Sequence, residues 1–251
     1  MSLGIRIVFL AWGAVALGNP TVESAMAGTE EASQVLSPDE WNRAERPFDG
    51  NHPLPFAARV RIAPGLPPLA IRLIPKASGA ASSEPAELGR IEISRPGEPA
   101  PFETLIAHGP GSPETFLRAS RLADVNFDGY PDLLVAGQDE PKGLAYTFYL
   151  FQPKSRTFVE DALARDMGAR LRGQLLEFQR ITGGIALRQK PSGCQSGFVW
   201  LERFVVDGDR LVKVEEQQHL QTPEGCFAVQ RRASPDGRME EISRYPVPEL
   251  H

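Results

Sequence analysis

The stretch LADVNFDGYPDLLV, residues 122–135, places an oxygen-rich loop between two apolar ends. Its side-chain oxygens recur at positions 1, 3, 5 and 9 of the loop, on Asp124, Asn126, Asp128 and Asp132. Gly129 permits a tight reversal, because glycine adopts positive φ without a steric penalty. The apolar runs on either side have the length and residue types of β-strands. The stretch therefore predicts a strand–loop–strand unit.

The loop predicts a calcium site, because hard cations take six to eight oxygen ligands and a tight loop with this spacing can aim them at one point. Three carboxylates within about 5 Å repel one another by roughly 3 kcal/mol per pair at an effective dielectric near 20, and a bound dication removes that repulsion. The loop differs from an EF-hand, since position 12 is Val135 and the flanks are strands. A metal-free turn rich in Asp and Asn is the alternative. The predicted ligands are the side chains of Asp124, Asn126, Asp128 and Asp132 and the carbonyl of Tyr130.

Short segments rich in β-branched residues recur along the chain between turn signals. Asp-Gly pairs at 207–208 and 236–237 mark hairpin reversals. The segment 159–171 instead repeats Leu and Met every four residues, which is a helical spacing. We therefore predict a mainly β fold: an antiparallel, propeller-like or sandwich or barrel array of short strands with one short helix. The predicted strands are 57–62, 69–74, 90–94, 102–107, 116–122, 133–136, 146–151, 176–182, 185–190, 197–206, 210–216, 226–232 and 238–245.

The N-terminus has the pattern of a secretory signal peptide. The apolar run 7–17 follows Arg6 and is too short to span a bilayer, and Ala25-Met26-Ala27 supplies small residues for cleavage. We predict a signal peptide at 1–27, a flexible linker at 28–48 with a short helix at 38–43, and a single β-rich calcium-binding domain at 49–251. The protein is expected to be periplasmic or secreted, with no transmembrane anchor.

Charge and cysteine content narrow the function classes. A net charge of −5 and a pI near 5.5 argue against nucleic acid as a partner. In an oxidising compartment Cys194 and Cys226 are the available pair, and their bridge would stabilise the fold by about 3–4 kcal/mol on the chain-entropy model. A catalytic thiol is the alternative, but His219, which lies between the two cysteines, is in no nucleophile motif.

No catalytic motif emerges from the sequence. The four histidines share no metal-ligand spacing, and the chain has neither a Gly-x-Ser-x-Gly sequence nor a glycine-rich phosphate loop after a strand. A hydrolase built on paired carboxylates is the alternative that spacing alone does not test. We predict that the protein is not an enzyme.

Two stretches carry a family resemblance. LADVNFDGYPDLLV (122–135) resembles the calcium loop of FG-GAP repeats, which occur in integrin-type propellers and in many exported bacterial proteins. Together with YTFYLFQPKSRTFV (146–159), it is similar to a family of exported bacterial immunity proteins, calcium-binding β proteins related to propellers. Characterised relatives inhibit a lysozyme-like peptidoglycan hydrolase delivered by a type IV secretion system.

The resemblance implies calcium ligation by Asp124, Asn126, Asp128 and Asp132 and assigns no inhibitory residues. The chain departs from membrane-anchored members because it has no lipobox cysteine. The expected function is protein recognition by an exported calcium-binding β domain, as a periplasmic inhibitor of a lysozyme-like hydrolase. The alternative is a structural or adhesive FG-GAP-type module whose calcium only stabilises the fold.

Overall fold

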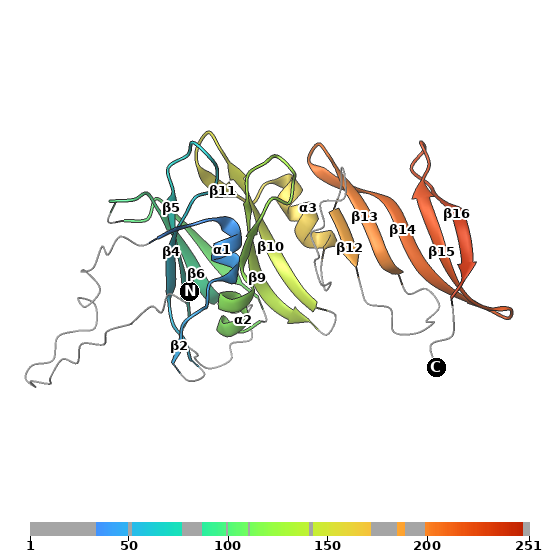
Figure 1. The fold of residues 1–251 in the computed structure, drawn as a ribbon, viewed down its shortest axis with the longest axis horizontal. Coiled ribbons are helices and arrows are strands. Elements are labelled where there is room, and N and C mark those ends of the chain that lie inside the picture. Colours follow the sequence, from blue (N-terminus) through green and yellow to red (C-terminus); the bar gives the residue numbers. More distant parts are fainter. Residues whose placement is uncertain are drawn as a thin grey trace, which may run out of the picture. The chain divides into compact units, whose positions relative to one another are not determined.

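The described part of the chain contains three larger, mainly antiparallel sheets and one short two-stranded sheet (Figure 1). The computed structural model describes residues 34–49, 52–76, 87–98, 100–109, 111–140, 143–171, 185–188 and 199–247. They belong to one unit, Gln34–His251. The predicted signal peptide and the predicted strand 176–182 lie outside the described residues.

The first sheet has the order β1-β4-β5-β6-β7, and all its pairs are antiparallel except β1 with β4. Its strands are β1 (Val35–Leu36), β4 (Phe56–Val60), β5 (Leu69–Pro75), β6 (Glu87–Ser94) and β7 (Glu103–His108). The two-stranded sheet pairs β2 (Phe48–Asp49) with β3 (His52–Pro53). Most of the strands predicted in this half are therefore confirmed.

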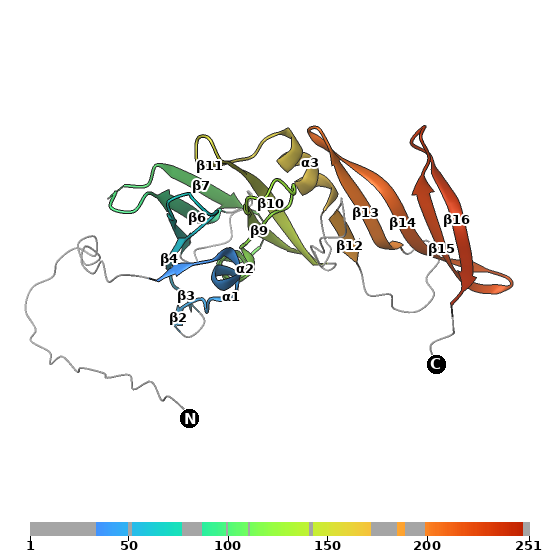
Figure 2. The same ribbon diagram turned by 45° about the horizontal axis from the view of Figure 1, so that its top comes forward.

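The middle sheet has the order β11-β10-β9-β8, and the third sheet runs β12-β13-β14-β15-β16 in chain order (Figure 2). The middle strands are β8 (Arg121–Ala123), β9 (Asp132–Glu140), β10 (Gly143–Gln152) and β11 (Thr157–Val159). The third sheet contains β12 (Ile185–Arg188), β13 (Val199–Asp207), β14 (Arg210–Thr222), β15 (Gly225–Ala233) and β16 (Met239–Pro246). The predicted Asp-Gly reversals are confirmed, because Gly208 and Gly237 have φ of 63° and 82°.

Two hydrophobic cores share the middle sheet. Along β9, Leu133 and Val135 belong to the first core, whereas Leu134 and Ala136 belong to the second. This alternation arises because successive side chains of a strand point to opposite faces. A strand buried on both faces has a continuous apolar sequence, as here. The first core includes residues of β5 and β6, and the second includes residues of α3, β12, β13 and β14.

The segment that follows β7 meets β9 of the middle sheet at three glycines, Gly109, Gly111 and Gly137. Gly111 N donates to Gly137 O at 3.1 Å. A Cβ atom at Gly109 would lie 1.9 Å from the same carbonyl oxygen. Backbone can approach backbone this closely only where no side chain intervenes, so glycine at 109 is required by packing.

Helix α1 (Pro38–Arg43) corrects part of the linker prediction. The predicted helix is confirmed: Ser37 caps it, Pro38 opens it, and Glu40 completes a capping box. Its Trp41 is fully buried in the first core, and the preceding β1 pairs with β4. The described part of 28–48 is therefore folded rather than a tether. The domain begins before residue 49, because the buried Trp41 side chain belongs to its hydrophobic core.

Helix α2 (Pro113–Ala119) replaces most of the strand predicted at 116–122. The Ser112 side chain accepts from Thr115 N, and Pro113 occupies the first turn, so this segment begins as α1 does. Phe116 and Leu117 are adjacent apolar residues, a pattern that is also typical of a buried strand, and both are buried here within a helix. Helix α3 (Ala162–Arg170) confirms the helical spacing at 159–171. The mainly β prediction is confirmed, and the described residues contain three short helices, of which α2 was not predicted.

Candidate functional site

The oxygen-rich loop connects β8 to β9 at one end of the middle sheet. Apolar residues anchor it in both cores: Val125 and Phe127 pack in the second, and Tyr130 packs against the first. Phe127 and Gly129 have φ of 62° and 90°, so two left-handed residues make the reversal. A non-glycine residue in this region costs energy, which the burial of an aromatic side chain helps to offset.

Side-chain oxygens of the loop accept from its own backbone. Asp124 Oδ2 accepts from Gly129 N at 3.1 Å, Asn126 Oδ1 accepts from Asp128 N at 3.2 Å, and Asp128 Oδ1 accepts from Tyr130 N at 2.9 Å. Asn126 Nδ2 also donates to Asp128 Oδ2 at 3.0 Å. These are the local bonds by which Asp and Asn stabilise turns. The loop therefore has the geometry of the Asx-rich turn that the sequence offered as the alternative.

Asp132 is the buried member of the set, with an exposed fraction of 0%. Its Oδ2 accepts from Val125 N at 3.0 Å and its Oδ1 accepts from Phe151 N at 2.8 Å, which ties the loop to β10. Burial raises the pKa of this carboxyl to about 7, the two backbone bonds oppose the shift, and the charges of Asp128 and Asp124 add to it. Negative charge is therefore crowded at this end of the sheet.

All five predicted calcium ligands lie in this one loop or at its end. Among the described residues, however, no three His, Cys, Asp or Glu side chains come together as a group that could hold a metal ion. The donor types suit calcium, which prefers carboxylate, amide and carbonyl oxygens. The crowding of charge around Asp132 is also what a cation would relieve. The residue chemistry thus fits calcium, whereas the side-chain arrangement is that of a hydrogen-bonded turn, and the calcium site stays a prediction.

The predicted disulfide is only half within the described residues. Cys226 is buried in β15, opposite Gln221 of β14. Cys194 lies outside the described residues. The bridge therefore stays a prediction.

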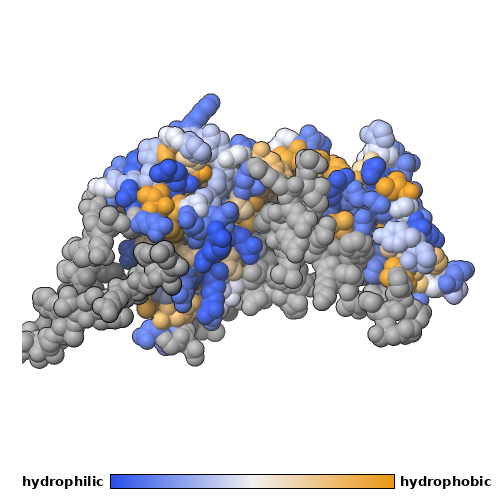
Figure 3. Space-filling model, in the orientation of Figure 1, coloured by the Kyte–Doolittle hydropathy of each residue, from blue (hydrophilic) through white to orange (hydrophobic). Residues whose placement is uncertain are grey.

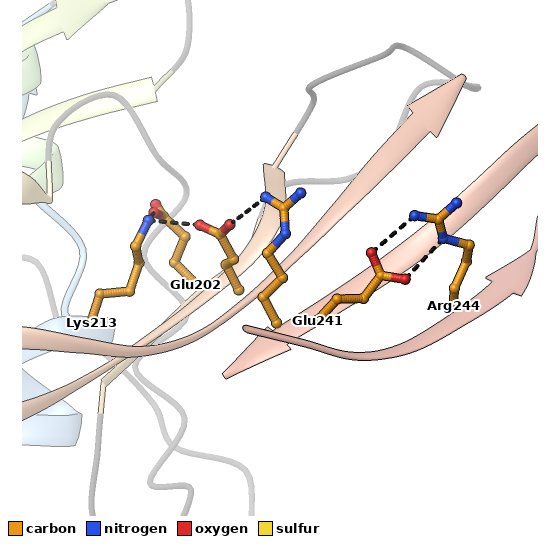
Figure 4. A network of polar contacts seen from close by, with 6 residues as sticks. Glu202, Lys213, Glu241 and Arg244 are labelled. Atoms are coloured by element: carbon orange, nitrogen blue, oxygen red, sulfur yellow. Dashed lines mark hydrogen bonds and ion pairs between the residues drawn. The ribbon is translucent and has the colours of Figure 1, made fainter. Parts of the chain in front are cut away.

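Sequence reasoning missed an ionic network across the third sheet (Figure 4). Glu216, which is 7% exposed, pairs with Lys213 at 2.7 Å and with Arg231 at 3.2 Å. Burial opposes the charge of Glu216, but the hydrogen bonds and attraction of these cations hold its pKa below the usual value. Lys213 also reaches Glu202 at 3.2 Å. Lys213, followed two and three residues later by Glu215 and Glu216, carries a weak signal for such a network.

Strand β16 forms an open edge of the third sheet, paired only with β15 in the described residues. Ile242 and Tyr245 are 47% and 46% exposed, the two most exposed large hydrophobic residues described. Figure 3 shows hydrophobic surface among hydrophilic residues at this end of the molecule. An edge strand offers unpaired backbone groups to another chain, so this edge is suited to protein contact.

The fold and the loop define a mainly β protein of antiparallel sheets with an Asx-rich loop at the end of the central one. The chain matches no protein-family model and no curated protein sequence. Its fold is similar to the solved structure of a Xanthomonas type IV secretion system related protein, with 16% sequence identity and a TM-score of 0.47. The alignment covers 76% of this chain and 99% of that one.

No helix in the described part of the chain is long and apolar enough to cross a membrane.

Proposed function

We propose that the protein is exported, binds calcium at the loop 124–132 and recognises another protein, a lysozyme-like peptidoglycan hydrolase that it inhibits. The observation that supports this most is the position of the loop, whose oxygen donors lie at one end of the middle sheet and whose apolar residues are anchored in both cores. The hydrolase as partner rests on the resemblance of residues 122–159. No catalytic residue is assigned in this proposal.

The calcium part of the proposal is tested by thermal unfolding of the full chain with calcium or with EDTA. A ligand at a hundredfold excess over its Kd stabilises the folded state by about 2.7 kcal/mol. We expect calcium to raise the Tm of the wild type but not that of Asp124→Asn or Asp128→Asn. Asp207→Asn is the matched control, since Asp207 lies at a hairpin and is 64% exposed, and it should respond like the wild type. An identical Tm with calcium and with EDTA in the wild type contradicts calcium binding.

The recognition part is tested by lysis of cell-wall peptidoglycan with a panel of lysozyme-like hydrolases. We expect the full chain to slow lysis by at least one of them. Ile242→Ser and Tyr245→Ser should weaken this inhibition tenfold or more, because they remove exposed apolar groups from the open edge of β16. Ile106→Ser is the matched control, a 39% exposed residue on β7, the edge of the first sheet. Unchanged lysis across the panel contradicts the inhibitor role.

A structural or adhesive module is the second candidate, and the bonding of Asp132 favours it. Both of its carboxylate oxygens accept from backbone N–H groups, so this residue already holds loop and sheet together. On this alternative the loop variants lower the Tm and abolish any calcium response, while no hydrolase is affected by any form of the protein. The two assays therefore separate the candidates.

A further inference from the structure

Arg46 is a buried arginine in the segment that follows α1. Only 9% of its surface is exposed. Its Cζ lies 4.2 Å from the centre of the Trp41 ring and 3.9 Å from that of Phe56. The two rings meet edge to face, with centroids 6.1 Å apart, so the guanidinium occupies the corner between them.

Arg46 differs from the other arginines that lie over aromatic rings in the described residues. Each of the others has a polar partner, whereas Arg46 Nη1 is buried without a hydrogen-bond partner, and so is the neighbouring Trp41 Nε1. The partnered arginines are Arg95 with Glu98 at 3.4 Å, Arg118 with Glu114 at 3.0 Å, and Arg121 with the Tyr146 hydroxyl at 2.8 Å.

A guanidinium that is largely buried without a counterion is costly, and its Nη1 has lost water and gained no acceptor. Stacking on aromatic rings offsets only part of this cost. Burial lowers the pKa of Arg46 to about 10, so the group is still charged at neutral pH. A water molecule could accept a hydrogen bond from it but would not neutralise the charge. An anion would both accept the hydrogen bond and neutralise the charge.

An open cavity of about 800 Å³ lies at this guanidinium, lined by Glu45, Arg46, Pro47, Phe48 and Arg118. Arg118, on α2, is itself stacked over Phe48 at 4.3 Å, which brings a second cation to the cavity. Helices α1 and α2 and the strand β2 lie close together here in both ribbon views (Figures 1 and 2). Glu45 is exposed and forms no described hydrogen bond or ion pair with Arg46. The cavity wall therefore presents a buried, unneutralised cation.

We propose that this cavity, the Arg46 pocket, binds a carboxylate group. Arg46 lines the cavity, and a guanidinium can donate two parallel hydrogen bonds to a planar carboxylate. The carboxylate comes from an acidic side chain of a partner protein or from a free small acid. The site uses neither the loop 124–132 nor β16 and is independent of the function proposed above.

The test is a titration of the full chain followed by ¹H–¹⁵N spectra of the tryptophan indoles. The probes are acetate, a glutamate residue with blocked amino and α-carboxyl groups, phosphate, and chloride at equal ionic strength. The Trp41 indole is assigned by elimination with Trp12→Phe and Trp200→Phe. We expect acetate and the blocked glutamate to shift the Trp41 resonance saturably, and chloride to leave it unchanged. Tighter binding of the blocked glutamate indicates a protein side chain as the occupant, and equal binding indicates a free acid.

Arg46→Gln should weaken acetate binding at least tenfold, and Arg118→Gln should weaken it about threefold. Arg95→Gln is the matched control, because Arg95 is also stacked on a ring but is paired with Glu98 and exposed. Arg118 is exposed, so its variant keeps the test valid even where Arg46→Gln fails to fold. No saturable shift in the wild type, or equal affinity in both Arg46→Gln and Arg118→Gln, overturns the proposal. A shift with phosphate but not with acetate overturns the assignment to a carboxylate.

Discussion

At the residue scale, Asp132 combines two properties that oppose each other. Its carboxylate is fully buried, which disfavours the charge, yet it accepts two backbone hydrogen bonds, which favour the charge. Its pKa of about 7 lies well above the ordinary 3.8. The folded protein therefore retains this proton at pH values where the unfolded chain has lost it.

We expect Asp132 to make stability depend on pH in an unusual direction for an aspartate. A raised folded pKa contributes stability that is complete below about pH 4 and is lost as the pH rises through 7. At 1.36 kcal/mol per pKa unit, this contribution is at most about 4 kcal/mol. Urea unfolding in EDTA at pH 4, 6 and 8 should show the wild type losing free energy of unfolding relative to Asp132→Asn. Parallel pH curves for the two proteins would show that the carboxyl keeps its ordinary pKa.

The sequence predicts Asp132 as a calcium ligand but does not predict that it accepts hydrogen bonds from the backbone. Its spacing from Asp124 is visible in the sequence, whereas its bond to Phe151 N depends on how β10 pairs with β9. Arg46 was missed for a similar reason. Its burial depends on the corner formed by Trp41 and Phe56, which only the packed core brings together.

At the scale of elements, the two N-terminal helices show how far local signals reach. Ser-Pro opens both α1 and α2, at Ser37 and at Ser112. The same signal predicts α1 correctly, whereas at α2 the adjacent apolar residues 116–117 favour a strand. The strands themselves were largely predictable, because alternation and Asp-Gly turns are local. Which sheet each strand joins was not, since long-range pairing leaves no period in the sequence.

The contact between the first and middle sheets is expected to be intolerant of a single methyl group. Gly109→Ala places Cβ 1.9 Å from Gly137 O, a backbone atom that cannot rotate away. We expect a loss of about 3 kcal/mol or more in free energy of unfolding. Gly65→Ala is the control, with no atom within 4 Å but φ of +82°, and should cost about 1 kcal/mol. Equal losses for the two variants, measured by urea unfolding, would show that backbone conformation and not sheet contact decides.

At the scale of the whole molecule, the two cores are joined through the middle sheet, and β9 contributes side chains to both. Leu134 belongs to the second core and Val135 to the first, although they are neighbours in β9. Because both faces belong to the same strand, β9 cannot unfold from one core and stay packed in the other. The two cores should therefore unfold together.

We expect Leu134→Ala and Val135→Ala to cost about 3 and 2 kcal/mol respectively and to shift the same single transition. Hydrogen exchange should show reduced protection in both α3, which packs in the second core, and β5, which packs in the first, for either variant. Loss of protection in α3 alone for Leu134→Ala would mean that the cores are separate cooperative units.

The alternating burial of β9 also limits how the length of this strand can change. Inserting or deleting one residue within 133–136 would turn every following side chain to the opposite face. Side chains that pack in one core would then face the other core. The hydrogen bond from Phe151 N to Asp132, at the end of the loop 124–132, would also be lost. We expect natural and engineered variants to differ in length at the exposed hairpin around Gly208 or Gly237 and to keep β9 at constant length.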